Sequence, residues 1–519
     1  MNTKISILST TIIFISGLAF AQPKLVKDVN PGSNSAIQNA NTFGFLNGEV
    51  FFAADDGVNG LELWKSDGNG QNTQLVKNIR DGGASSSPNF YHKLDDKLIF
   101  YANDGVHGNE LWITDGTEEG TQLLKDIYPG SNSSLYNARN FAELNGKLYF
   151  TADDGVNGKE LWSTDGTEGG TNLVIDLNYN PQSATPEYII ALNGKLFFTG
   201  RLGNSPGSNV IVSDGTEAGT SVLFQTNPGS NGTPINLIAA NDGFYFTARH
   251  PTYGLELWKS DGTPAGTKFV KDIWPNDNGI NYSWFANSSR TNYLTVGNKL
   301  YFVGRQTTGL EHALWVSDGT EEGTIQLTDP TNPAHPKQFE AMAEFNGGII
   351  FNGRSAQEGY EPFFSDGTPE GTRLIKNLNT GSTSSLKGST RFYSWLGRTV
   401  FIATHPDGEN IYITDGTEQG TNIFYSGLGT NVGANHAQLM VLDSSIYYFA
   451  FLGTTGFELW NYKYQPFSAS LGIKEEIKCN GDKNGRLGIS PVGGYSPFSV
   501  QWENPDITSA TPSNLAAGI

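Results

Sequence analysis

Three short loops in this sequence gather oxygen-bearing side chains at close spacing. They are residues 55–60 (DDGVNG), 103–108 (NDGVHG) and 153–158 (DDGVNG). Carboxylate and amide oxygens are the ligands that Ca²⁺ prefers, so the sequence predicts a calcium site at Asp55, Asp56, Asp153 and Asp154. A solvated turn is the competing interpretation, because the spacing is not that of an EF-hand loop. Calcium is the only cofactor that the residues suggest.

A second candidate site is a group of aromatic residues in a lengthened connection. Asp-Gly steps recur along the chain 47 to 50 residues apart, but one interval is 57 residues long. This interval contains Trp274, Tyr282, Trp284 and Phe285. A lengthened loop with exposed aromatic side chains is a typical ligand-binding site, so these four residues are predicted to bind a surface glycan or a protein ligand. The competing interpretation is that they plug the ring or cover the edge of a blade.

Other chemistry has little support in the sequence. The seven histidines are dispersed, and neither an HExxH motif, a GxSxG elbow nor a phosphate-binding GxxxxGK[ST] loop is present. The only cysteine is Cys479. The chain has 52 acidic residues, and a catalytic pair of carboxyl groups could form among them only in the folded protein.

The elements that must position these residues repeat along the chain. The Asp-Gly step falls at Asp67, Asp115, Asp165, Asp214, Asp261, Asp318, Asp366 and Asp415. Four of these steps follow a Glu-Leu-Trp triplet, the others follow degenerate copies of it, and a ninth repeat has its triplet at Glu458 without the Asp-Gly step. Each repeat contains four short runs of β-branched and aromatic residues, bounded by Asn-Gly or Asp-Gly turns. Four strands in about 49 residues are one propeller blade. The sequence therefore predicts an all-β protein with a single nine-bladed propeller, or an eight-bladed ring with one displaced repeat.

The two ends of the repeat region predict how the ring closes. Residues 25–29 match the fourth strands of later repeats, whereas the last repeat has three strands and lacks a fourth. An N-terminal strand that completes the last blade would leave no exposed sheet edge. The sequence thus predicts a closed β-propeller over residues 22–464.

Residues 24–464 resemble the ELWxxDGT repeat family, which implies a secreted, propeller-like bacterial surface protein. Residues 465–519 form a different module, which is similar to the SprB-type adhesin repeat through CNGD at 479–482, PFSVQW at 497–502 and NLAAG at 514–518. This second resemblance implies an immunoglobulin-like β-sandwich that the sequence covers only in part, without the closing cysteine that would pair with Cys479.

The N-terminus and the charge indicate an exported protein. Residues 1–21 have the apolar run and the Ala19-Phe20-Ala21 site of a signal peptide. A net charge of −19 disfavours nucleic acid as a partner, and no later segment is long enough for membrane insertion. These features predict a non-enzymatic binding or adhesion protein, extracellular or at the cell surface. The alternatives are a propeller glycosidase or polysaccharide lyase that uses acidic residues near the central channel, and a carbohydrate-binding module. The oligomeric state is not indicated.

Overall fold

The computed structural model is an all-β protein with almost no helix. It describes residues 23–492, except for 33, 38–42, 136–140, 179–182, 204, 206, 227–231, 274–292, 306–311, 389, 429–438, 452–455, 465–467 and 476–485. Within these residues the strands form nine four-stranded antiparallel sheets and one two-stranded sheet. The prediction of nine blades is confirmed, and the eight-bladed alternative is wrong.

Eight of the blades take four consecutive strands each. Blade 1 contains β2 (Gly44–Leu46), β3 (Glu49–Asp55), β4 (Leu61–Ser66) and β5 (Gln74–Lys77), with the short 3-10 helix η1 (Gly70–Asn72) before β5; blade 2 contains β6 (Asn89–Leu94), β7 (Lys97–Asn103), β8 (Asn109–Thr114) and β9 (Gln122–Lys125). Blade 3 contains β10 (Ala142–Leu144), β11 (Lys147–Asp153), β12 (Lys159–Thr164) and β13 (Asn172–Ile175); blade 4 contains β14 (Glu187–Leu192), β15 (Lys195–Gly200), β16 (Asn209–Ser213) and β17 (Ser221–Phe224). Blade 5 contains β18 (Ile235–Ala240), β19 (Gly243–His250), β20 (Gly254–Ser260) and β21 (Lys268–Lys271); blade 6 contains β22 (Tyr293–Val296), β23 (Lys299–Arg305), β24 (His312–Ser317) and β25 (Ile325–Gln326). Blade 7 contains β26 (Gln338–Phe345), β27 (Gly348–Ser355), β28 (Gly359–Ser365) and β29 (Arg373–Leu374); blade 8 contains β30 (Tyr393–Trp395), β31 (Arg398–His405), β32 (Gly408–Thr414) and β33 (Asn422–Ser426).

The ninth blade combines the two ends of the repeat region. It contains β34 (Leu439–Leu442), β35 (Ser445–Phe451), β36 (Phe457–Lys463) and, as its outer strand, β1 (Lys24–Lys27). Strand β1 pairs antiparallel with β36, with Leu25 opposite Trp460. After this blade, β37 (Ser468–Glu475) and β38 (Arg486–Val492) pair as a two-stranded sheet. The other residues of the predicted sandwich lie outside the described residues.

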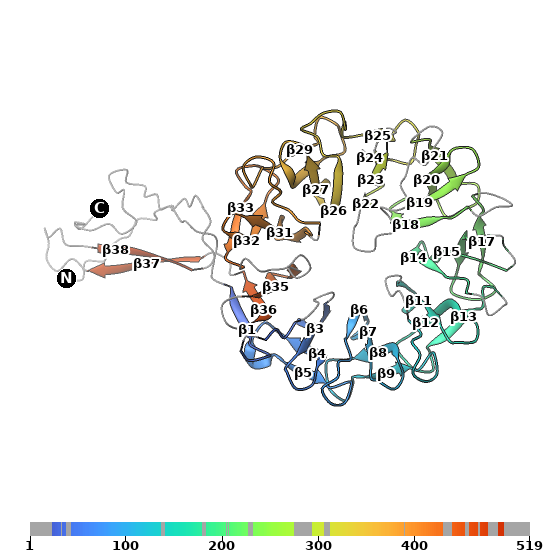
Figure 1. Ribbon diagram of the computed structural model, residues 1–519, viewed down its shortest axis with the longest axis horizontal. Coiled ribbons are helices and arrows are strands. Elements are labelled where there is room, and N and C mark those ends of the chain that lie inside the picture. The colour runs from blue at the N-terminus through green and yellow to red at the C-terminus, as the bar shows by residue number, and fades with distance from the viewer. Residues whose placement is uncertain are drawn as a thin grey trace, which may run out of the picture.

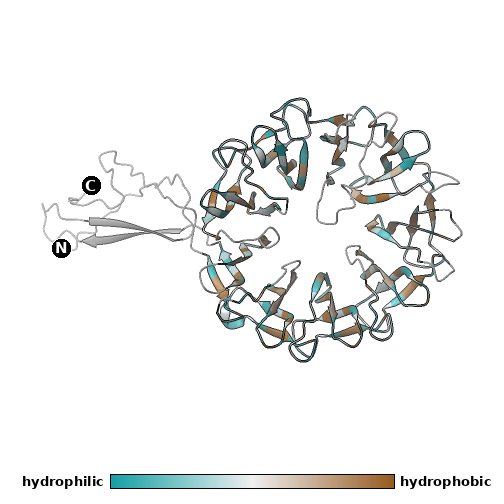
Figure 2. Cartoon of the chain, in the orientation of Figure 1, coloured by the Kyte–Doolittle hydropathy of each residue, from teal (hydrophilic) through white to brown (hydrophobic). Residues whose placement is uncertain are grey.

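The blades are arranged around a centre, with the first strand of each blade innermost and the fourth outermost (Figure 1). The second and third strands are buried along most of their length, as in β7 and β24, and Figure 2 shows apolar residues on strands throughout the propeller. The apolar clusters join neighbouring blades: Phe51 and Leu63 of blade 1, for example, pack with Phe100 and Trp112 of blade 2. The tryptophans of the Glu-Leu-Trp triplets at 64, 112, 162 and 258, and the corresponding Trp315 of an Ala-Leu-Trp triplet, are only 5–7% exposed, so they are packing residues.

The Asp-Gly-Thr segments are structural turns between the third and fourth strands. In blade 2, Asp115 Oδ1 accepts hydrogen bonds from the backbone N–H and the hydroxyl of Thr117, at 2.8 and 2.7 Å. Gly116 has a φ of +94°, which an L-residue rarely adopts. The hydroxyl bond from Thr117, followed by the backbone bond, lowers the pKa of Asp115. The same bonds recur at Asp165, Asp214, Asp261, Asp318, Asp366 and Asp415. These aspartates therefore hold the turn.

The glutamate of the Glu-Leu-Trp triplet clamps the loop that leads to the next blade. Glu110 is fully buried, and its carboxylate accepts hydrogen bonds from the backbone N–H of Ile127 and Ser134 and from the Ser134 hydroxyl. The same 17- and 24-residue spacing recurs at Glu62, Glu160 and Glu361. Glu458 makes the corresponding bonds to Val29 and Ala36 of the N-terminal segment. Burial raises the pKa of four of these clamp glutamates to about 7: Glu110, Glu160, Glu361 and Glu458.

A lysine on the fourth strand reaches from one blade to the next. Lys77 Nζ of blade 1 donates to the carbonyl of Thr121 in blade 2, at 2.8 Å. Lys125, Lys271 and Lys376 make the same contact with the following blade. Lys27 of β1 donates to the carbonyl of Thr73 in blade 1, also at 2.8 Å. Strand β1 thus contacts the first blade while it pairs with the last.

None of the helical segments in the described part of the chain has the length and apolar character needed to cross a membrane.

Candidate functional site

The acidic loops predicted to bind calcium use their carboxylates within the loop. Asp55 Oδ1 accepts the backbone N–H of Gly57, whereas Asp56 accepts the backbone N–H of Val58 and Asn59 on Oδ1 and the Asn59 amide on Oδ2. Burial alone would raise the pKa of Asp56, but these hydrogen bonds outweigh it and lower the pKa. Among the described residues, no three His, Cys, Asp or Glu side chains gather as a metal site would require.

The second pair of predicted calcium ligands repeats this arrangement in blade 3. Asp153 accepts the backbone N–H of Gly155, and Asp154 accepts those of Val156 and Asn157 together with the Asn157 amide. Asp55 is the last residue of β3 and Asp153 the last of β11, and Asp56 and Asp154 follow them, so the two pairs belong to different blades. The four aromatic candidates, Trp274, Tyr282, Trp284 and Phe285, lie outside the described residues.

The alternative of a glycosidase or lyase requires acidic side chains on the innermost strands of the blades. Glu143, Glu187 and Glu344 lie on such strands and are exposed. Glu340 lies on β26, the innermost strand of blade 7, and is 3% exposed. Burying a carboxyl group so deeply costs folding free energy unless neighbouring groups hydrogen-bond to it. Glu340 is therefore the strongest candidate for a functional carboxyl group on these strands.

The backbone around Glu340 departs from a regular strand. The pairing of β26 with β27 shifts between Phe339 and Met342, so Glu340 sits in a bulge. The innermost strands of blades 2, 4 and 5 shift at the same place, where Phe90, Tyr188 and Asn236 have φ values of +54°, +54° and +59°. Bulges re-aim one side chain and are common beside active sites. In two blades this position holds a half-buried aromatic residue that packs against the core, and in blade 7 it holds a buried carboxyl group.

A tyrosine, a glutamine and an arginine surround the Glu340 carboxyl group within blade 7. The Tyr360 hydroxyl, at the start of β28, lies 3.3 Å from Glu340 Oε1 and 2.9 Å from Gln338 Oε1. Arg354 Nη1 donates to Gln338 Oε1 at 3.2 Å, and its guanidinium lies over the Tyr360 ring, 5.8 Å from the centroid. The phenol is thereby held beside the carboxyl group, with a cation behind it.

The loop that connects blade 7 to blade 8 supplies the other side of the cluster. A Cβ at Gly388 would lie 3.7 Å from the Glu340 carboxyl group, so this loop passes directly against it. The neighbouring Lys387 forms an ion pair with Glu409, at the start of β32. Burial raises the pKa of Glu409, although the Lys387 side chain opposes this shift. Arg391 Nη1 donates to the carbonyl of Gly388 and so fixes the loop beside Glu340.

The Glu340 cluster therefore contains Glu340, the Tyr360 hydroxyl beside it, the Gln338 and Arg354 side chains that contact Tyr360, and the loop backbone at Gly388. The Lys387–Glu409 ion pair and Arg391 adjoin this cluster through the same loop. A buried carboxyl group beside a phenol is suited to general acid–base chemistry, and local cations stabilise negative charge that develops in a reaction. The sequence analysis missed Glu340. The signal it offered was a polar residue where other repeats carry an aromatic one.

Comparisons with known proteins find no matching family model and no match among curated proteins. Among solved structures, the chain is similar to puromycin hydrolase, with 12% identity, a TM-score of 0.36, and coverage of 75% of this chain and 62% of that one. It is also similar to the tricorn protease, with 13% identity, a TM-score of 0.25, and coverage of 90% of this chain and 44% of that one. A third similar structure is the β-propeller domain of the Trilobed protease from Pyrococcus furiosus, which has an open velcro topology. The identity is 14%, the TM-score is 0.32, and the match covers 62% of this chain and 94% of that one. The chain spans about three fifths of the length of puromycin hydrolase.

This result contradicts the expectation of a non-enzymatic binding or adhesion protein, because the similar propellers belong to proteins named as hydrolases and proteases. At these identities and TM-scores the likeness concerns the propeller fold and assigns no substrate to this chain. What the present protein acts on has to be argued from its own residues.

Proposed function

We propose that this protein is a glycan-cleaving enzyme, a glycosidase or polysaccharide lyase, and that Glu340 is its acid–base residue. The observation that carries the proposal is the buried Glu340 carboxyl group on an innermost strand, beside the Tyr360 hydroxyl. Glycoside cleavage needs a proton donor for the leaving oxygen and a base on the other side of the bond. The Glu340 carboxyl group and the Tyr360 hydroxyl, 3.3 Å apart, would supply these two proton-transfer groups without a serine or cysteine nucleophile.

The remaining residues of the cluster position this group. Gln338 and Arg354 hold the Tyr360 ring and hydroxyl. Lys387 pairs with Glu409, and Arg391 holds the backbone at Gly388 against Glu340. Each of these side chains acts through Tyr360, Glu409 or the loop, and we regard them as positioning residues.

The charge of the cluster favours an acidic polysaccharide and hence the lyase form. Arg354, Lys387 and Arg391 outnumber the two carboxylates, in a chain whose net charge is −19. A local excess of cations attracts an anionic substrate. In a lyase, the base would remove the proton from C5 of a uronate while the cations stabilise its carboxylate. The C5–H electron pair would form the C4–C5 double bond, the C4–O bond would break, and the acid would protonate the departing oxygen.

The test is turnover by purified protein against polygalacturonate, alginate, xylan and β-glucan. Ultraviolet absorbance of the new double bond would report elimination, and reducing ends without it would report hydrolysis. Glu340→Gln should lower kcat by about 10² to 10⁴-fold, and Tyr360→Phe should also lower it. Glu344→Gln is the matched control, because Glu344 is exposed on the same strand. Equal activity in Glu340→Gln and the parent would refute the assignment, and binding without cleavage would leave a carbohydrate-binding module.

We also infer that the propeller ring is closed by β1. The pairing of β1 with β36, the bonds from Val29 and Ala36 to Glu458, and the contact of Lys27 with Thr73 support closure. Export, membership of the ELWxxDGT family and a partial SprB-type sandwich at the C-terminus remain proposals that rest on sequence resemblance. Mass spectrometry of the secreted protein, with cleavage after Ala21, would test the first.

A further inference from the structure

A second buried polar side chain occupies the bulge position of an innermost strand, in blade 5. Asn236 is 3% exposed, and neither its amide nitrogen nor its amide oxygen has a hydrogen-bond partner among the residues that the structure describes. Its backbone has a φ of +59°, so the side chain is held by an uncommon conformation that asparagine tolerates better than most residues. Buried amides without partners are rare in folded proteins and call for an explanation.

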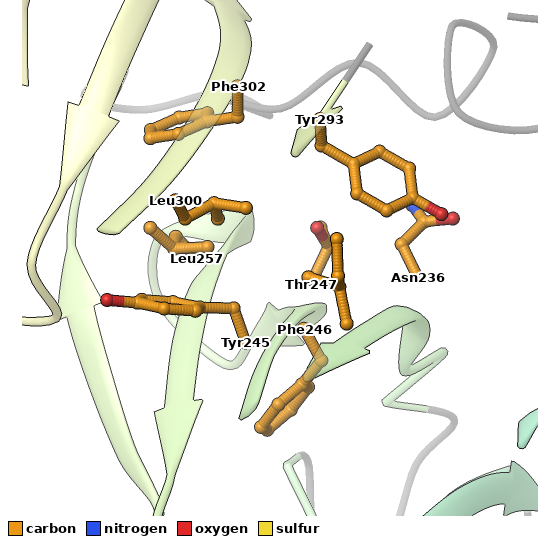
Figure 3. Close-up of a pocket in the computed structure, with 9 residues that line it drawn as sticks. Asn236, Tyr245, Phe246, Thr247, Leu257, Tyr293, Leu300 and Phe302 are labelled. Carbon is orange, nitrogen blue, oxygen red and sulfur yellow. The ribbon is translucent and has the colours of Figure 1, made fainter. Parts of the chain in front are cut away.

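The Asn236 side chain borders a small cavity between blades 5 and 6. The cavity has a volume of about 10 Å³ and is lined by Asn236, Thr247, Leu257, Tyr293, Leu300 and Phe302, among others. Figure 3 shows Asn236 and Tyr293 on one side of it and Leu257, Leu300 and Tyr245 on the other. A volume of this size holds one water molecule or one hydroxyl group.

The chemistry of the lining selects the occupant. The Asn236 amide offers a donor and an acceptor, so its complement both accepts and donates a hydrogen bond, as a hydroxyl group does. The aliphatic and aromatic side chains on the opposite wall offer no competing polar partner, so the occupant is a single small group directed at the amide. A wholly apolar group would leave the amide unsatisfied, and an isolated ion would find no countercharge in this lining.

We propose that this cavity binds one hydroxyl group of a sugar residue of the substrate, with a water molecule in its place when no sugar is bound. This inference rests on the proposed glycan-cleaving function and adds a subsite to it. The subsite belongs to blades 5 and 6, whereas the Glu340 cluster belongs to blades 7 and 8, so the substrate would be a polymer that extends over several blades.

The experiment measures binding apart from cleavage. Affinities of Glu340→Gln protein for four tetrasaccharides, from polygalacturonate, alginate, xylan and cellulose, would be measured by calorimetry. Asn236→Leu in this background should weaken the binding of the preferred tetrasaccharide at least 10-fold, since both amide hydrogen bonds are lost. Tyr188→Leu, at the equivalent bulge of blade 4, is the matched control and should leave the affinity unchanged. Circular dichroism would confirm that each variant is folded.

A crystal structure with the bound tetrasaccharide should place a sugar hydroxyl beside Asn236, and one without it should place a water there. Failure of all four tetrasaccharides to bind, or equal affinity of Asn236→Leu and its parent, would overturn the proposal. A water that stays in the cavity while the sugar binds elsewhere would do the same. Failure of the proposed glycan-cleaving function can be distinguished from failure of this subsite, because it would appear as undiminished turnover in Glu340→Gln.

Discussion

Truncation of one valine in β1 tests whether this strand is an integral part of the last blade. Val26 is 6% exposed and packs with Trp64 of blade 1 and with Phe449 and Leu459 of blade 9. Val26→Ala removes two methyl groups from this cluster. At about 0.8 kcal/mol for each buried methyl group, plus the cost of the cavity left behind, the loss is about 2 kcal/mol.

The sequence supplies a matched control in blade 1. Strand β5 has the sequence QLVK where β1 has KLVK, and its Val76 is also 6% exposed. Leu75 lies opposite Trp64 as Leu25 lies opposite Trp460, with the same shift of register on the next residue. Val76→Ala should therefore cost about the same, and the one difference is that β5 follows its own blade in the chain whereas β1 does not.

Hydrogen exchange reports the opening of each strand locally, which avoids assuming two-state unfolding of the whole ring. A loss of about 2 kcal/mol corresponds to exchange about 30-fold faster. Val26→Ala should produce this change in peptides of β36, and Val76→Ala should produce it in peptides of β4. Faster exchange in β4 with Val76→Ala but unchanged exchange in β36 with Val26→Ala would refute the closure of the ring by β1.

Three further predictions concern the repeated elements. Four clamp glutamates, Glu110, Glu160, Glu361 and Glu458, have pKa values of about 7, above the ordinary 4.5. Their contribution to stability is therefore fully present below about pH 4.5 and is lost as the pH rises through 7. The melting temperature should fall between pH 5 and 8, and it should fall less steeply in Glu110→Gln. A flat profile in the parent would contradict this. Thr121→Val removes a buried hydroxyl that lies 2.7 Å from Thr114 Oγ1 and bonds the Thr117 carbonyl, and it should cost about 1 to 3 kcal/mol in urea unfolding; a midpoint equal to that of the parent would count against the turn's role. Millimolar calcium should leave the melting temperature unchanged, because both carboxylate oxygens of the second aspartate in each DDGVNG loop accept hydrogen bonds within the loop. A rise in melting temperature that is lost when the four candidate aspartates are changed to asparagine would instead establish a calcium site.

The architecture could be predicted because each repeat contains the same turn and strand motifs. Asp-Gly turns at a regular interval set the number of blades, and the orphan run at residues 25–29 predicted the pairing of β1 with β36 that the structure shows. The role of the clamp glutamates was also within reach. Each is followed 17 and 24 residues later by the residues whose backbone N–H groups it accepts. The sequence analysis used the triplet only as a marker of the repeat and did not consider this constant spacing.

The Glu340 cluster could not be predicted in the same way, because its members come from segments that no local pattern connects. Tyr360, Lys387 and Glu409 are 20, 47 and 69 residues further along the chain. Tyr360 contacts Glu340 from a neighbouring strand of the same blade, whereas the loop that carries Lys387 passes against Glu340 at Gly388 and pairs with Glu409. Strict alternation along β26 would not predict this geometry, since a bulge changes the face on which the following side chains lie.

The repeat also explains why the two proposed sites lie where they do. At the bulges of blades 2 and 4, the half-buried side chains of Phe90 and Tyr188 pack against the apolar clusters. Asn236 and Glu340 occupy the same position and are each 3% exposed, so they bring polar atoms into a buried region. Such a substitution destabilises a fold unless the polar group is used. Because it occurs on innermost strands, the departures from the repeat are concentrated around the centre of the ring, where one extended substrate could reach both.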